Sequence, residues 1–520
     1  MLTIDTEHTD FGKEPSIMNK NLTKILWGIS IFAGIFYIVL FFSLSIPRLL
    51  YPYELEWMEG AILEHAIRIL DGKQLYVHPS IEFVNWLYQP FYYYASAAAM
   101  KIFGVSFFAG RFVSYCTTLM SAGIIFYIVR KISFERFLVP FIAVSLLFAS
   151  YNATGYSFDI ARIDALLVFL LLAAALCLIF SKSLFSVIAS AVFISLAIFT
   201  KQLAILYLIP CLLWLSLTDK KRLTVFALCS VLFIAVGILI LVVQNGQWYQ
   251  YYVFDVPRGK AAHGGFGWLG IFKVFPGYIF TIWTSGTFVI LTYLILQKKN
   301  GLKTFLISWE GFITLLFLTS VIQIALHSGD RASYRNVMLP FVCFTAILFP
   351  IALKKVRENL SEFASQAFLF TLPIQFIALF YNPLHDPLVI ITDKEISAGK
   401  QFYSELHDLP GDIYLPMHGL LPQLAGKKQF ANELAMGDVW MIDDSISRMV
   451  KKEYYQEFNN HRFSYIVTDD NLYRTMFHAD DSITGYMFNK RINNSSNPFI
   501  SRIGDSPSTP CKLFIPKNSE

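Results

Sequence analysis

The chain has 520 residues, of which 55% are hydrophobic and 15% charged, and its formal net charge is only +5. Its mean hydropathy is +0.51, whereas soluble domains carry about 25% charged residues. These values exclude a secreted enzyme, a fibrous protein, a disordered chain and a DNA-binding domain, so we expect no nucleic-acid partner.

Charged residues are unevenly distributed along the chain. They make up about 12% of residues 1–381 and about 23% of residues 382–520. We therefore predict an α-helical polytopic membrane protein with a small C-terminal α/β domain. Its parts are a cytoplasmic N-terminal segment at 1–24, a transmembrane domain at 25–381 with an outer loop at 47–107, and an extracytoplasmic domain at 382–520.

Apolar segments that are long enough, or nearly so, to cross a hydrocarbon core of about 30 Å predict about eleven transmembrane helices. The first lies at 25–46; it is too long for a signal-peptide core and is expected to be retained. The others lie at 108–130, 137–151, 160–180, 183–199, 203–218, 223–243, 276–296, 304–326, 337–353 and 364–381.

Basic clusters occupy alternate connections between these segments, at Lys20/Lys24, Arg130–Arg136, Lys182, Lys220–Arg222, Lys298–Lys303 and Lys354–Arg357. By the positive-inside rule these connections face the cytoplasm, so the loop at 47–107 and the C-terminal domain face outward, across a bacterial inner (plasma) membrane. If the short apolar segment at 88–104 crossed the membrane, every later connection would change sides and the basic cluster at Arg130–Arg136 would face outward. The positive-inside rule therefore favours a juxtamembrane or re-entrant helix at the outer surface for this segment.

The first outer loop contains two candidate catalytic carboxylates. Glu56 and Glu59 are three residues apart, so they would share one face of an amphipathic helix that lies on the membrane. A carboxylate beside aromatic residues can accept a proton from a hydroxyl or an amine. A solvated acidic face without chemistry is the alternative.

A second group of charged residues opens the fourth apolar segment. Asp159 and Arg162 would share a helix face, and Asp164 would lie about 7 Å deeper. Ionisable residues at a membrane edge usually pair or line a cavity. Either an Asp159–Arg162 pair anchors the helix, or the group faces one cavity with the first-loop carboxylates, where Arg162 contacts a phosphate.

Later connections offer further candidate ligands. Lys201 separates two apolar runs and either snorkels to the membrane edge or contacts a phosphate. Arg331 and Arg335 are four residues apart and would present two guanidinium groups to one phosphate if they are helical; a charged turn is the alternative. His263 lies in a loop of aromatic and cationic residues, which suits either a sugar and a lipid headgroup or an interfacial aromatic belt.

The C-terminal segment has the pattern of a small α/β domain. Residues 412–416 and 465–468 have the pattern of short buried strands, and residues 445–459 that of an amphipathic helix. It contains no nucleotide-binding glycine loop. We expect this domain to recognise the acceptor or to support the site.

Four motifs lie between residues 50 and 130: Glu59-Gly60 with the later Gly72–Tyr76, Tyr88-Gln89-Pro90-Phe91, Phe103–Ser106, and Gly110-Arg111. With them the chain resembles the GT-C superfamily of polyprenyl-phosphate-dependent glycosyltransferases, which includes protein O-mannosyltransferases and lipid A aminoarabinose transferases. Two positions depart from the family pattern. Met58 stands where the family has an Asp, and Gln89 stands where the aminoarabinose branch has a Lys.

The resemblance implies a GT-C-like transmembrane domain that transfers a sugar from a polyprenyl-phosphate donor to a glycan, lipid or protein acceptor on the outer face, with inversion at the anomeric carbon. Membrane lipids are further partners. No obligatory cofactor is expected, no metal ligand is assigned, and Mg²⁺ or Mn²⁺ stays an open alternative. A lipid or glycan transporter or flippase without transferase activity is the competing hypothesis, and a scaffold is a third.

The candidate residues divide by role. Glu59 or Glu56 is the expected base, with Asp159 as a further catalytic candidate. The donor phosphate would be bound by Arg162, Lys201, Arg331, Arg335 and Gln89. The substrate would also contact Asp164, Tyr88, Tyr92 and His263.

Overall fold

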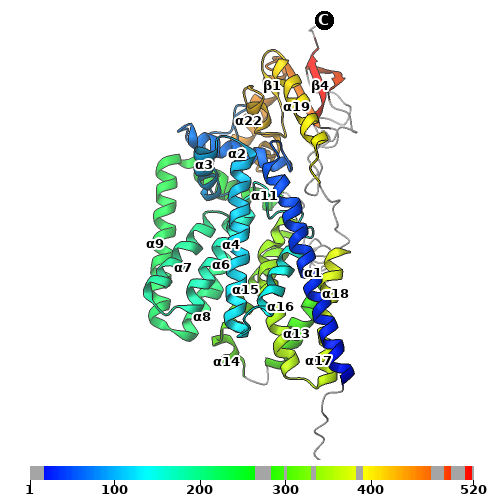
Figure 1. Cartoon of the computed structure of the whole chain (residues 1–520). Coiled ribbons are helices and arrows are strands. Elements are labelled where there is room, and N and C mark those ends of the chain that lie inside the picture. Colours follow the sequence, from blue (N-terminus) through cyan, green and yellow to red (C-terminus); the bar gives the residue numbers. More distant parts are fainter. Residues whose placement is uncertain are drawn as a thin grey trace, which may run out of the picture.

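Long apolar helices form a bundle, and a small sheet domain covers one end of it (Figure 1). The computed structural model describes residues 17–263, 283–297, 301–328, 335–381, 390–469, 485–492 and 510–517. We call the end that carries the sheet domain the domain end of the bundle, and the opposite end, where α14 (Leu302–Ile307) and α17 (Glu362–Leu369) lie, the far end.

Seven helical segments in the described part of the chain are long and apolar enough to cross a membrane. They comprise α1 (Ile17–Leu50), α4 (Phe107–Ser133), α6 (Ile163–Phe180), α9 (Lys220–Asn245), α15 (Trp309–Ser328), η5 (Arg335–Met338) with α16 (Leu339–Glu358), and α17 with α18 (Thr371–Phe380). The chain is thus an integral multi-pass membrane protein. α16 is buried along its whole candidate span, and it packs against α13, α15 and α5.

Four shorter apolar helices occupy the remaining predicted segments. They are α5 (Leu138–Ala149), α7 (Leu184–Ile198), η1 (Gln202–Tyr207) with α8 (Leu208–Thr218), and α13 (Thr284–Gln297). Every predicted apolar segment therefore contains a helix, while the number that crosses the membrane stays a prediction. Ser183 and Asp219 cap α7 and α9 with side-chain oxygens, which explains why the helices begin there.

Two short helices lie between the bundle and the sheet domain (Figure 1). α2 (Trp57–Leu70) is buried from Trp57 to Ile67, on all sides. The predicted helix is present, but a solvated face is wrong, because the C-terminal domain covers the face that was expected to meet water. Its place on the membrane surface stays a prediction. α3 (Phe91–Phe103) has 13 residues and packs between α2 and α4. α10 (Gln247–Gln250), η2 (Tyr251–Asp255) and α11 (Val256–His263) follow α9.

The C-terminal domain combines helices with a sheet whose described strands have the order β1-β2-β4-β3. β1 (Ile413–Tyr414) pairs with β2 (Tyr465–Asp469) in parallel, and β4 (Pro510–Pro516) runs antiparallel to β2 and β3 (Tyr486–Arg491). The helices are α19 (Asp393–Asp408), α20 (Leu421–Leu424), α21 (Glu433–Trp440) and α22 (Ser445–Asn459). The two predicted strands and the predicted helix are confirmed, whereas β3 and β4 were not predicted.

Candidate functional site

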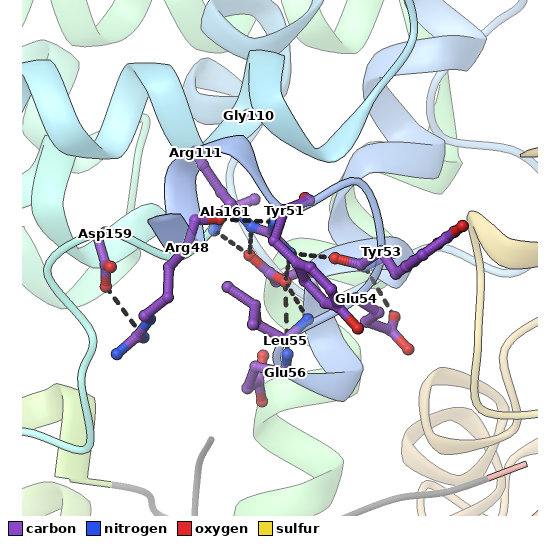
Figure 2. A network of polar contacts seen from close by, with 12 residues as sticks. Arg48, Tyr51, Tyr53, Glu54, Leu55, Glu56, Gly110, Arg111, Asp159 and Ala161 are labelled. Atoms are coloured by element: carbon purple, nitrogen blue, oxygen red, sulfur yellow. Dashed lines mark hydrogen bonds and ion pairs between the residues drawn. The ribbon is translucent and has the colours of Figure 1, made fainter. Parts of the chain in front are cut away.

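Buried charged side chains gather at the domain end, where α1, the turn before α2, α4 and the loop before α6 meet (Figure 2). Glu56, Glu59, Asp159, Arg162 and Asp164 are each less than 5% exposed. Charges buried in this way must be paired to be tolerated. The pairs therefore show which residues act together.

Glu59 and Arg111 form the most completely bonded pair. Arg111 donates from Nε and Nη2 to the two carboxylate oxygens of Glu59 at 2.7 and 2.6 Å. Its remaining donors reach the backbone oxygens of Arg48, Tyr51 and Tyr53 at 2.6 to 3.0 Å. All five donors of the guanidinium group are thus used, and Arg111 fixes the chain from the end of α1 to the start of α2 (Figure 2).

The same bonds argue against Glu59 as the base. Its carboxylate also accepts from the amides of Leu55 and Ala161 at 2.8 and 2.9 Å. Burial by itself would raise the pKa of Glu59, but the charge and hydrogen bonds of Arg111 and these amides lower the pKa below its usual value. A carboxylate that is held ionised and fully bonded is a poor proton acceptor, so the geometry favours the other candidate, Glu56.

Glu56 is the N-cap of α2, not a residue on the same helix face as Glu59. One oxygen accepts from the amide of Met58, and the other accepts from Nη1 of Arg162 at 3.1 Å. Burial raises the pKa of Glu56 to about 7, against the opposing charge of Arg162. A carboxyl group with such a pKa can accept a proton at neutral pH.

Arg162 continues this network toward α6 and η1. Its Nε lies 4.0 Å from Asp164, whose other oxygen is 3.0 Å from Nζ of Lys201. Asn336 donates to Asp164 at 2.7 Å. The structure thus brings together four sequence-predicted residues, Glu56, Arg162, Asp164 and Lys201, in one buried chain of alternating charge.

Asp159 belongs to a different pair from the one that the sequence suggested. It bonds Arg48 at 3.1 Å and the hydroxyl of Tyr151 at 2.6 Å. The helix begins only at Ile163, because its N-cap Arg162 has an extended backbone (φ −131°, ψ 157°), which lies outside the right-handed helical region. The predicted Asp159–Arg162 pair on one helix face, and the depth assigned to Asp164 from it, are therefore wrong.

The aromatic and amide candidates have structural partners. The hydroxyl of Tyr92 donates to the backbone oxygen of Gly110 at 3.0 Å, and Gln89 accepts from the hydroxyl of Tyr249 at 3.0 Å. Tyr88 is partly exposed, and its ring lies parallel to that of Trp86 at 6.4 Å. Binding roles for these residues stay predictions.

The remaining candidates lie at the edge of the described structure. Arg335 is buried in η5, with its guanidinium group near Gly155. His263 ends α11, and its side chain, like the whole of Arg331, lies outside the described residues. Over the part of the chain that the structure describes, no group of three or more His, Cys, Asp or Glu side chains is arranged to hold a metal ion.

Several important residues were not among the predicted site residues: Arg48, Arg111, Glu54, His418 and Asp469. Arg48 and Arg111 stand within apolar helices, where a charge is costly without a partner, and this signal could have identified them. His418 and Asp469 lie in an ordinary soluble sequence and carry no such signal.

Comparison with known proteins begins with a family match. Residues 78–248, about a third of the chain, match the family model of dolichyl-phosphate-mannose-protein mannosyltransferases. None of the curated proteins compared with the sequence matches it.

The fold is similar to two groups of solved structures. ArnT from Cupriavidus metallidurans, solved with undecaprenyl phosphate, has a TM-score of 0.54 and 12% identity over 86% of this chain and 94% of that chain. The apo oligosaccharyltransferase of Archaeoglobus fulgidus has a TM-score of 0.52 and 10% identity over 85% of this chain and 69% of that chain. At these identities the likeness shows the fold.

The fold and the buried ionic site thus define a multi-pass membrane protein of GT-C architecture. The family match, over about a third of the chain, and the shared fold are both similarities to polyprenyl-phosphate-dependent glycosyltransferases of the GT-C superfamily. These similarities support the hypothesis of a glycosyltransferase with a lipid-linked sugar donor.

Proposed function

We propose that the protein transfers a sugar from a polyprenyl-phosphate donor to an acceptor at the domain end of the bundle. The observation that carries this proposal is the buried chain Glu56–Arg162–Asp164–Lys201. It places a carboxyl group with a raised pKa next to Arg162, and Asp164 connects this pair to a second cation, Lys201. A base and cations that offset a departing phosphate are what displacement of a lipid phosphate requires.

The proposed step is one direct displacement. The acceptor oxygen or nitrogen attacks the anomeric carbon, its proton passes to Glu56, and the bond from that carbon to the phosphate oxygen breaks. The polyprenyl phosphate leaves with the electron pair, and Arg162 and Lys201 offset its charge. Because attack and departure occur on opposite sides, the configuration at the anomeric carbon inverts.

Lys201 can take this role without leaving its present position. Its ammonium group has three donors, and one of them is 3.0 Å from Asp164. Asn336 holds the other oxygen of Asp164. Asp164 therefore positions the cation rather than the acceptor, which revises its expected role in substrate contact.

We infer that the domain end faces the extracytoplasmic side of a bacterial inner membrane. Arg130 and Lys131 lie in the last turn of α4, and Lys354 of α16 donates to the backbone oxygen of Ser133 at that same far end. Clustering of basic residues there supports a cytoplasmic far end. The polyprenyl-linked donor and its glycan, lipid or protein acceptor would then meet at the domain end, on the extracytoplasmic side.

The test is a transfer assay with purified protein and polyprenyl-phosphate sugars, run with and without Mg²⁺ or Mn²⁺. We expect Glu56→Gln to lower the rate by about 100-fold or more, which is the lower range for loss of a general base. Glu82→Gln, at a side chain that is half exposed, is the matched control. Full activity of Glu56→Gln would overturn the assignment, and mass spectrometry of co-purifying lipids would identify the donor independently.

A further inference from the structure

A buried histidine of the C-terminal domain lies between two carboxylates. Nδ1 of His418 hydrogen-bonds Glu54, which lies in the turn before α2, and Nε2 hydrogen-bonds Asp469 at the end of β2 at 3.0 Å. The three residues are at most 4% exposed. They come from three segments of the chain, so the contact joins the first loop to the C-terminal sheet.

The histidine is charged in this position. Burial alone would lower the pKa of His418, but Asp469 and Glu54 outweigh it and raise the pKa to about 10. Both ring nitrogens then carry hydrogens and donate, one to each carboxylate. Both hydrogen bonds are charge-assisted on the histidine side, and such bonds are about twice as strong as neutral ones. Burial raises the pKa of Glu54 to about 7, against the charge of His418.

The surrounding backbone is fitted around this contact. Glu54 also accepts from the amide of Gly60 at 3.2 Å. A Cβ at Gly60 would lie 2.8 Å from the amide nitrogen of Leu420, and a Cβ at Gly419 would lie 2.9 Å from Cα of Ala61. The two glycines thus allow the loop after β1 to approach α2 at a distance that no other residue permits.

The segment fixed in this way carries the proposed base. Glu56 lies two residues after Glu54 and caps the same helix whose first turn Gly60 occupies. In Figure 2 Glu54 and Tyr53 point to one side of the turn, away from Arg48 and Asp159. Arg111 and Glu59 hold the turn from the bundle, and His418 holds it from the opposite side.

We propose that the C-terminal domain is part of the transferase site, and that His418, through Glu54, is a positioning residue that holds Glu56 against Arg162. The proposal rests on the proposed function for its catalytic meaning. It assigns a role to a domain whose own sequence shows no catalytic motif. A misplacement of about 1 Å at a reacting group lowers rates by about 100-fold. The His418–Glu54 contact, which fixes the turn before α2, would therefore affect turnover.

The matched control is a second contact between the same two parts of the chain. Arg462 of the C-terminal domain pairs with Glu82 at 2.9 Å, and both side chains are more than a third exposed. Arg462→Gln therefore weakens docking without touching the turn before α2. His418→Gln removes the charge but keeps an amide that can bond, and Glu54→Gln tests the same contact from the other side.

Two measurements are made on the full-length protein. We expect His418→Gln to lower kcat by about 10- to 100-fold with KM for the lipid donor changed by less than about threefold, and Arg462→Gln to change neither. We also expect faster hydrogen exchange in peptides that cover residues 53–60, in His418→Gln and Glu54→Gln only. Glu54→Gln and His418→Gln remove the same contact. The double variant should therefore lose no more activity than whichever single variant is the less active.

Exchange and kcat of His418→Gln equal to wild type would overturn the proposal, as would an equal loss in Arg462→Gln. If His418→Gln does not fold, Glu54→Gln carries the same test. If the wild-type protein transfers no sugar, the proposed function fails, while hydrogen exchange still decides whether His418 holds the turn.

Discussion

Arg111 donates from Nε and Nη2 to both carboxylate oxygens of Glu59, and neither side chain is exposed to solvent. This pair lies beneath the turn that carries Glu56 and connects it to α4 and to the backbone before α6. Glu59 is the residue in the motif shared with the family, and this pairing with Arg111 makes its role structural. Glu56 is therefore the better candidate for the proton acceptor.

Loss of this pair should cost stability. Glu59→Gln leaves the buried guanidinium group of Arg111 without its counter-charge, and breaking a buried pair costs about 3–5 kcal/mol. Lys73→Gln removes the exposed pair with Asp71 and should cost less than about 1 kcal/mol. Unfolding in detergent measures both. If Glu59→Gln is as stable as wild type yet inactive, Glu59 is again the better candidate for the base.

The transfer rate should depend on pH. A base accepts a proton only when it is ionised, and burial raises the pKa of Glu56 to about 7 against the charge of Arg162. The rate should therefore rise with pH up to about 7 and level off above it. Glu54 and Glu59 also face Glu56 and raise its pKa, so in Glu54→Gln the rise should move to lower pH. The measurement is kcat against pH, and a rate independent of pH below 7 contradicts the assignment.

Donor binding should depend on Lys201. Charge-assisted bonds contribute about 1.5–3 kcal/mol, so Lys201→Gln should weaken binding of polyprenyl phosphate by about tenfold or more. Lys354→Gln, at the far end of the bundle, is the matched control and should bind as wild type does. Titration of each variant with the lipid, followed by native mass spectrometry, measures the difference. Equal affinity in both variants would remove Lys201 from the donor site.

Close packing at Gly60 should not tolerate a methyl group. In Gly60→Ala the new Cβ lies 2.7 Å from Glu54 and 2.8 Å from the backbone of Leu420, so the loop after β1 must move, at a cost of about 1–3 kcal/mol. Gly123→Ala, in α4 with nothing within 4 Å of its Cβ, should be neutral or slightly stabilising. Thermal unfolding compares the two. Equal stability of both variants would mean that the loop after β1 can move away from α2 at little cost, and would contradict the prediction.

Much of the fold follows from the sequence because hydropathy is a local property. Each predicted apolar segment contains a helix, and the rise in charge after residue 381 marks the C-terminal domain. The helix at 445–459 and the strands at 412–416 and 465–468 also carry clear local patterns. β3 carries no such pattern: its residues from Phe488 to Arg491 are exposed, so its alternation is weak.

The site was less predictable because helix phase and partner choice are not local. Asp159 and Arg162 have the spacing of a helical pair, but the extended backbone of Arg162 leaves both residues in the loop before α6. Glu56 and Glu59 have helical spacing too, yet Glu56 caps the helix from outside it. Spacing alone therefore placed these side chains on surfaces that they do not share.

By itself, the sequence determined that this is a helical membrane protein with a soluble-type C-terminal domain and an acidic first loop that resembles the GT-C pattern, since composition, periodicity and motifs are all read within one segment. Only the tertiary structure decided the partner of each charge. Glu59 meets Arg111 across 52 positions, Asp159 meets Arg48 across 111, and Glu54 meets His418 across 364. A buried charge is stable only with a counter-charge, and which one it meets depends on how distant segments pack.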